Sequence, residues 1–175
     1  MIAKSNKIIL LFVTVVFLGV LSACMTTMHS QPGTTTTVIM IRHADRNLTG
    51  SKLTERGIKN AQALVKELGH MNIAAIYSPD LVRNLETVRP LAKHLGINIS
   101  KVGDEPDEQQ VVLTIIEKHA GQTVLWVGNS YNLPEIYRLL GGKGGPPLKY
   151  GDLFILTVPD QGDTIVVKSK WGDNE

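Results

Sequence analysis

The sequence predicts an α/β fold: a three-layer α/β/α sandwich with a mostly parallel central sheet. Short apolar runs rich in β-branched residues alternate along the chain with amphipathic segments of helical period. Polar and charged residues follow several of these runs, at the points where the predicted strands end. In open α/β sheets the ligand crevice lies beyond the carboxyl ends of the strands, so we expect these polar side chains to converge on one edge.

The first predicted strand covers residues 37–41, an apolar run without glycine or proline. Thr54 is a candidate N-cap for the helix that follows. The apolar residues that recur at helical spacing in that helix are Ile58, Ala61, Leu64, Val65 and Leu68. Gly69 then ends the pattern.

The second predicted strand covers residues 73–77. Ser78 and Pro79 follow it, and we expect them to cap and start the next helix. Pro90 lies within that helix and should kink it, because proline has no N–H to donate. Further strands are predicted near residues 97–100, 123–127, 153–158 and 164–171, and further helices end near His119 and Leu140.

The first 24 residues have the pattern of an export signal. Lys4 and Lys7 form a positive start, residues 8–20 are an almost unbroken apolar run, and small residues precede Cys24. This run is shorter than the about 20 apolar residues that a membrane-spanning helix needs. We therefore expect an exported protein.

The residues Leu21-Ser22-Ala23-Cys24 resemble the lipobox of bacterial lipoproteins. This resemblance implies cleavage before Cys24 and lipidation of that residue, which would anchor the protein to a membrane, at the periplasmic side or in the cell envelope. It divides the chain into a signal peptide (1–23), a polar tether (24–34) and a folded domain (35–175). An uncleaved anchor and a secreted protein with one spare thiol are the alternatives.

The charge of the mature chain is balanced. The sequence has 18 Lys and Arg against 16 Asp and Glu, and Lys4 and Lys7 are the only charges before Cys24, so removing these two leaves 16 against 16. A balanced chain without a basic block gives no reason to expect nucleic-acid binding.

Three common chemistries do not fit the sequence. Residues 128–132 nearly match the nucleophile elbow of serine hydrolases, but the final glycine is missing and no histidine follows Ser130 to act as the base. Residues 141–145 contain a Gly-Lys pair but lack the Ser or Thr and the upstream glycine of a P-loop. The five histidines, His29, His43, His70, His94 and His119, lie in separate elements and have no metal-ligand spacing.

Phosphoryl transfer fits the residues at the strand ends. A neutral imidazole, here His43, can attack phosphorus and form a phosphohistidine that water later cleaves. The transferred group carries negative charge, which Arg42 and Arg83 could stabilise, with Arg46 as a third candidate. The proton donor for the leaving group is left open among five acids: Asp45, Asp104, Glu105, Asp107 and Glu108.

Four ordered motifs resemble those of the histidine phosphatase superfamily, which has the phosphoglycerate mutase-like fold. They are Arg42-His43-Ala44-Asp45, residues 53–57, Ser78 to Arg83 with Thr87, and Val127-Gly128-Asn129-Ser130. The resemblance covers residues 37–171 and implies His43 as nucleophile, Arg42 and Arg83 as phosphoryl ligands, and no metal or cofactor. It is closest to small bacterial members without a large cap. Such an open site would admit phosphate groups on large molecules, such as envelope glycans or phosphoproteins.

One position departs from this pattern. The family has a second histidine where this chain has Asn129, beside Ser130, and we expect both residues to contact the substrate. An amide can donate a hydrogen bond but carries no charge, and the loss of one preorganised donor costs about 10²–10³ in rate. We favour a working phosphatase with a weakened or altered site. The alternative is a pseudophosphatase that binds a phosphorylated ligand at the envelope.

Overall fold

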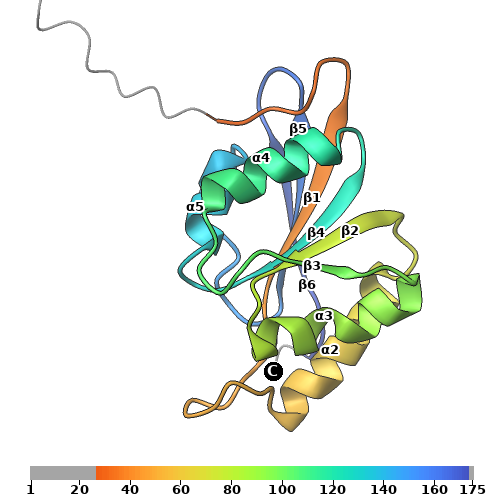
Figure 1. The fold of residues 1–175 in the computed structure, drawn as a ribbon, viewed down its shortest axis with the longest axis vertical. Coiled ribbons are helices and arrows are strands. Elements are labelled where there is room, and N and C mark those ends of the chain that lie inside the picture. Colours follow the sequence, from red (N-terminus) through yellow and green to blue (C-terminus); the bar gives the residue numbers. More distant parts are fainter. Residues whose placement is uncertain (1–26, 174–175) are drawn as a thin grey trace, which may run out of the picture.

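The computed structural model describes residues 27–173 as a six-stranded sheet flanked by helices (Figure 1). The strands are β1 (Thr35–Arg42), β2 (Ile73–Ser78), β3 (Ile99–Lys101), β4 (Thr123–Gly128), β5 (Asp152–Pro159) and β6 (Ile165–Lys170). The helices are α2 (Glu55–Leu68), α3 (Val82–Leu95), α4 (Glu108–Lys118) and α5 (Leu133–Leu139).

The sheet is mixed but mostly parallel, with the strand order β3-β2-β4-β1-β5-β6. The first four strands in this order run parallel to one another, whereas β5 is antiparallel to both of its neighbours, β1 and β6. Helices α2 and α3 cover one face of the sheet, and α4 and α5 cover the other. This arrangement confirms the predicted α/β sandwich.

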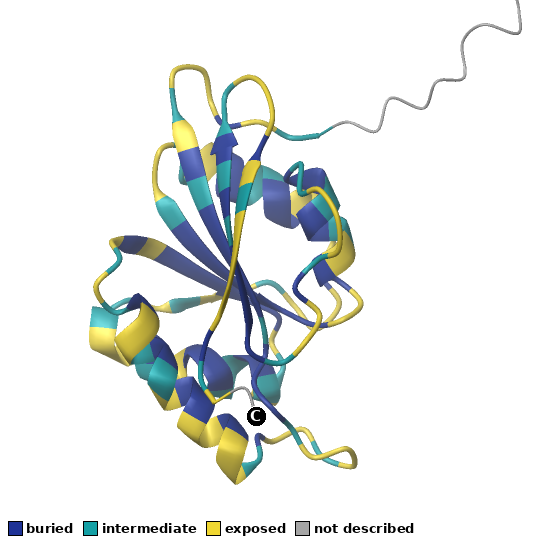
Figure 2. Cartoon of the chain, turned by 180° about the vertical axis from the view of Figure 1, so that it is seen from behind, coloured by how far each residue is buried: buried dark blue, intermediate teal, exposed yellow. Residues whose placement is uncertain are grey.

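Strand β1 lies at the centre of the sheet and contributes to both halves of the core. Val38 and Met40 pack with α4 and α5, whereas Ile39 and Ile41 pack with α2 and α3. A strand covered by helices on both faces must be apolar on both, which explains why this run lacks an alternating pattern. Figure 2 shows the buried residues gathered along the central strands and the exposed residues on the outer sides of the helices.

Two details of the predicted helices differ from the structure. Thr54 caps α2 as expected, because its Oγ1 accepts a hydrogen bond from Gly57 N–H at 3.0 Å. However, the inner face of α2 is formed by Gly57, Asn60, Ala61, Leu64 and Leu68, and Ile58 is exposed. The burial of Asn60 in place of Ile58 rotates this face by a fraction of a turn.

The helix after β2 begins later than predicted, at Val82, and Ser78 does not cap it. Ser78 is the last residue of β2, and its hydroxyl donates to Pro79 O at 2.8 Å. The backbone stays extended because Ser78 O accepts from Val102 N and Asp80 N donates to Gly103 O, which prolongs the contact with the end of β3. Pro90 lies inside α3, which continues through it to Leu95.

The predicted signal peptide and Cys24 lie outside the described residues, and the predicted tether (24–34) is described only from Thr27. This described part contacts the folded domain through backbone hydrogen bonds. Met28 N donates to Leu139 O at 2.8 Å, and Ser30 N donates to Pro159 O at 3.0 Å. The buried Ser30 hydroxyl also contacts Thr36 Oγ1 at 2.6 Å. The folded unit therefore includes residues that precede Thr35.

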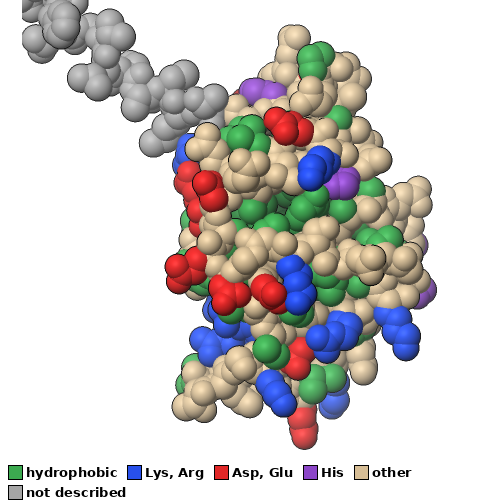
Figure 3. All heavy atoms as spheres, in the orientation of Figure 1, with side chains coloured by type: hydrophobic (Ala, Val, Ile, Leu, Met, Phe, Trp, Pro, Cys, Tyr) green, Lys and Arg blue, Asp and Glu red, His purple; other side chains and the backbone are tan. Residues whose placement is uncertain are grey.

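Within residues 27–173, no helix combines the length and the apolar character needed to cross a membrane. On the face shown in Figure 3, acidic and basic side chains lie interspersed, as the balanced composition leads one to expect.

The docking of the N-terminal segment can be tested with Ser30→Ala. This variant loses the hydroxyl contacts to Thr34 and Thr36, and we expect the free energy of unfolding to fall by about 1–2 kcal/mol in denaturant titration. Gln31→Ala is the matched control, because that side chain is exposed. Equal stability of the two variants would contradict the docking.

Candidate active site

The predicted site residues meet where β1, β2 and β4 end. Arg42, the last residue of β1, pairs in register with Gly128, the last residue of β4. His43 N–H donates to Gly128 O at 3.1 Å, which continues this pairing by one residue and fixes His43 at the sheet edge. A Cβ at Gly128 would lie 2.6 Å from Asn132 Oδ1, so only glycine fits at this crossing.

His43 is nearly buried, with 2% of its surface exposed. Its Nδ1 lies 2.8 Å from Ala44 O, and because a carbonyl only accepts, Nδ1 carries the proton. Nε2 therefore keeps its lone pair. The pKa of His43 is lowered to about 4, mainly by burial. The hydrogen bond to Ala44 acts in the opposite direction, and the charges of the neighbouring arginines lower the pKa as well. The imidazole is thus neutral at pH 7, as a nitrogen nucleophile must be.

Arg42 is held by residues from the loop before β5. Its Nη1 donates to Leu148 O at 2.8 Å, and its guanidinium carbon lies 4.3 Å from the centre of the Tyr150 ring. The Tyr150 ring is also tilted against His43, with 5.6 Å between the ring centres. Arg42 Nε is buried and has no partner among the described residues. A buried donor without an acceptor is costly, and a bound oxyanion would satisfy it.

Arg83 lies in the first turn of α3 and is positioned through Asn129. Its Nε donates to Asn129 Oδ1 at 3.1 Å, and Asn129 Nδ2 donates to Tyr131 OH at 3.1 Å. Tyr131 OH in turn donates to Asp104 O at 3.0 Å. Asn129 therefore links Arg83 to Tyr131. Burial and the charges of Arg46 and Arg42 lower the pKa of Arg83.

Two further side chains join α3 to the strand ends. Thr87 Oγ1 accepts from Ala44 N at 2.9 Å and donates to Arg83 O at 2.7 Å. The buried Asn84 donates from Nδ2 to the carbonyls of Val127 and Gly128 at 3.2 and 3.3 Å. These bonds fix the relative positions of His43 and Arg83, which are distant in the sequence.

Arg46 completes an arginine cluster that we define as Arg42, Arg46 and Arg83. Arg46 Nη1 donates to the carbonyls of Asn47, Leu48 and Gly50, and its charge lowers the pKa of both His43 and Arg83. Within the described chain, none of these arginines forms an ion pair with an aspartate or a glutamate. The edge therefore carries uncompensated positive charge, which favours an anion.

The five acids considered as proton donors have different surroundings. Asp45 is buried and forms an ion pair with Arg56, and it also accepts from Asn60 at 3.4 Å. Asp107 caps α4, and Glu108 is the first residue of that helix. Asp104 and Glu105 are exposed and contribute to the raised pKa of Tyr131, so these two lie nearest the site on this side.

The sequence did not single out Tyr131 and Tyr150, although both contact the predicted site residues. Tyr131 follows the fourth motif directly and could have been found there. Tyr150 and Leu148 belong to a glycine- and proline-rich loop that carries no motif. Ser130 is exposed beside Asn129.

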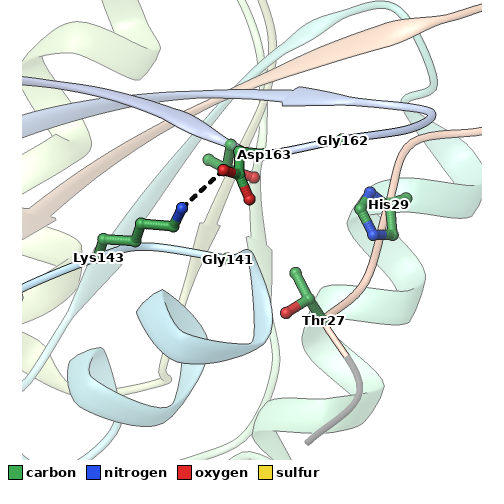
Figure 4. A pocket seen from close by; sticks show the side chains of 7 residues that line it. Thr27, His29, Gly141, Lys143, Gly162 and Asp163 are labelled. Carbon is green, nitrogen blue, oxygen red and sulfur yellow. Dashed lines mark hydrogen bonds and ion pairs between the residues drawn. The ribbon is translucent and has the colours of Figure 1, made fainter.

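A pocket of about 310 Å³ lies at the opposite end of the sheet (Figure 4). It is bordered by Thr27 and His29, by Lys143 and by Asp163, which accepts from Lys143 Nζ at 2.7 Å. Asp163 belongs to the turn after β5, and β5 ends beside the start of β1, so this pocket is separate from the site residues. The described residues contain no group of three His, Cys, Asp or Glu side chains that could hold a metal.

The lowered pKa of His43 predicts a pH dependence of stability. Between pH 6.5 and about 4 the unfolded chain binds a proton that the folded chain does not, so stability falls as the pH falls through this range. We expect this to amount to about 3 kcal/mol in denaturant titrations, and to be absent in His43→Gln. An equal pH slope in both proteins would contradict a neutral, buried His43.

Known proteins resemble this chain in sequence and in fold. The sequence model of the histidine phosphatase superfamily (branch 1) matches residues 38–104, a segment that contains Arg42, His43 and Arg83. A search of curated protein sequences gave no significant match.

Similar solved structures cover most of this chain. Bacillus stearothermophilus YhfR is 22% identical, with a TM-score of 0.60 and coverage of 75% of this chain and 95% of its own. The protein histidine phosphatase SixA complexed with tungstate is 14% identical, with a TM-score of 0.58 and coverage of 77% and 96%. The mycobacterial glucosyl-3-phosphoglycerate phosphatase with inorganic phosphate is 15% identical, with a TM-score of 0.56 and coverage of 78% and 97%.

At these identities the structural likeness concerns the fold, and the sequence match concerns residues 38–104. Two of the three similar structures are phosphatases by their own descriptions. Residues 38–104 thus match the histidine phosphatase superfamily (branch 1), and the fold of the chain is similar to that of the three solved structures.

Proposed function

We propose that this protein hydrolyses phosphomonoesters through a phosphohistidine on His43, without a metal or another cofactor. The observation that carries the proposal is a neutral imidazole with a free Nε2 lone pair beside an arginine cluster that lacks carboxylate partners. Tetrahedral oxyanions, tungstate and phosphate, are bound in two of the similar structures, which supports the same kind of ligand here.

In the proposed reaction, His43 Nε2 attacks phosphorus and the bond from phosphorus to the ester oxygen breaks. The leaving oxygen departs with the electron pair and takes up a proton. Arg42 and Arg83 stabilise the charge on the phosphoryl oxygens, and the buried Arg42 Nε gains an acceptor. Water then cleaves the nitrogen–phosphorus bond, which releases inorganic phosphate and restores the neutral imidazole.

The rate of the proposed hydrolysis depends on Asn129. Its amide oxygen accepts from Arg83, so it positions a phosphoryl ligand of the proposed reaction even though it adds no charge of its own. We therefore favour a working, slowed phosphatase. The second candidate is a pseudophosphatase that binds a phosphorylated ligand, which the missing charge at Asn129 and the small exposed fraction of His43 favour.

Turnover of a simple aryl phosphate by the full-length protein tests the proposal. We expect His43→Ala to abolish turnover, because the nucleophile is lost. Asn129→His should raise the rate by about 10²-fold, because it restores a charged donor. His70→Ala is the matched control, since His70 is an exposed histidine that follows α2.

The outcomes separate the two candidates. Full turnover by His43→Ala would overturn the phosphohistidine mechanism. Absent turnover in the wild type that Asn129→His restores would support the binding protein.

We also propose that the protein is exported and anchored by lipid on Cys24, on the periplasmic side of a membrane or in the cell envelope. The lipobox-like residues 21–24 support this, and they end three residues before the first described residue. Mass spectrometry of the native protein should find an acylated N-terminal Cys24. An intact Met1 would contradict the anchor.

A further inference from the structure

Four exposed apolar residues neighbour the arginine cluster in sequence or through hydrogen bonds. Leu48, Val82, Tyr131 and Leu148, which we call the apolar rim, are 95%, 42%, 50% and 37% exposed. The carbonyl of Leu48 accepts from Arg46, that of Leu148 accepts from Arg42, and Val82 directly precedes Arg83. Each arginine therefore has an exposed apolar neighbour, so the part of a substrate next to the phosphate would meet apolar surface.

Two tyrosines contact the predicted site residues. The Tyr150 ring contacts the His43 ring and the Arg42 guanidinium. The Tyr131 hydroxyl bonds to Asn129, and both tyrosines act electrostatically on Arg83. Aromatic rings favour stacked or edge-to-face contact with another ring, so these side chains suit a flat leaving group.

The surroundings of His43 also limit the leaving group. The charged groups that shift its pKa are all arginines, and Asp45, its nearest acid in the sequence, is paired with Arg56. An aliphatic alkoxide is strongly basic and needs a positioned acid to protonate it as it leaves. A phenolate has a conjugate acid of pKa about 10, like tyrosine, and can leave without one.

We propose that the site is selective for aryl phosphomonoesters, in which the phosphate is carried on the oxygen of an aromatic ring. The inference rests on the proposed function and names its substrate class. His43 Nε2 forms the bond to phosphorus, and the phenolate leaves with the electron pair and takes a proton from water. Tyr131 and Tyr150 contact the ring of the ester. Phosphotyrosine is the protein-borne member of this class.

Binding of phosphonates to the full-length protein tests this selectivity without chemistry, because the carbon–phosphorus bond is not hydrolysed. Isothermal titration should show phenylphosphonate binding about tenfold more tightly than methylphosphonate, and more tightly than cyclohexylphosphonate. Tyr131→Leu and Tyr150→Leu should each reduce this preference. Ile165→Ser, an exposed apolar residue at the start of β6, is the control that should retain it.

Equal affinities for methyl- and phenylphosphonate would overturn the proposal. Affinity for cyclohexylphosphonate equal to that for phenylphosphonate would do so as well, since apolar contact alone would then explain binding. A ring preference without any turnover would retain the inferred ligand class and overturn only the hydrolytic function. Absence of binding by all three phosphonates would overturn both.

Kinetics provide the second test. We expect kcat/KM for phosphotyrosine to exceed that for phosphoserine by more than about 10²-fold, since a positioned acid contributes about 10²–10⁴ and the charged groups that act on His43 are arginines. Equal values would show that a proton donor acts in the site, which overturns the leaving-group argument.

Discussion

The parallel pairing of β1 with β4 is the constraint on which the site depends. It places Arg42 beside Gly128, and one further hydrogen bond, from His43 N–H to Gly128 O, sets the nucleophile of the proposed reaction at the sheet edge. Gly128 must lack a side chain because Asn132 occupies that space, and Asn132 Oδ1 accepts from Asn129 N. Asn129 then holds Arg83. If the pairing of β1 with β4 shifted by one residue, Arg42 and His43 would each turn to the other face of the sheet.

The sequence predicts this arrangement well where the contacts follow from strand order. Apolar runs marked the central strands, and parallel strands bring their carboxyl ends to one edge, so Arg42, His43, Arg83 and Asn129 could be grouped in advance. The contact of Arg42 with Leu148 O could not be predicted, because the two residues are 106 positions apart and the loop of Leu148 carries no motif. The prediction that Ser78 caps a helix was wrong, because serine can lie at a helix N-cap or at the end of a strand.

Local charge differs from overall charge in this chain. The folded part is balanced in composition, yet three arginines share one edge without a carboxylate partner among the described residues. The acid closest in sequence, Asp45, is held by Arg56 and Asn60 from the adjoining helix. Keeping Asp45 in that ion pair leaves the arginines free for an anion and keeps a negative charge from competing with it.

Asn129 changes the character of the site beyond removing a charge. An amide accepts and donates at once, so it bonds Arg83 through oxygen and Tyr131 through nitrogen, which a histidinium could not do because it only donates. The positive charges of the site are guanidiniums, which stay protonated, whereas His43, with a pKa of about 4, is neutral near pH 7. Without a second titrating histidine, the site keeps one charge state from about pH 5 upward, so an anion meets the same positive edge throughout the neutral range.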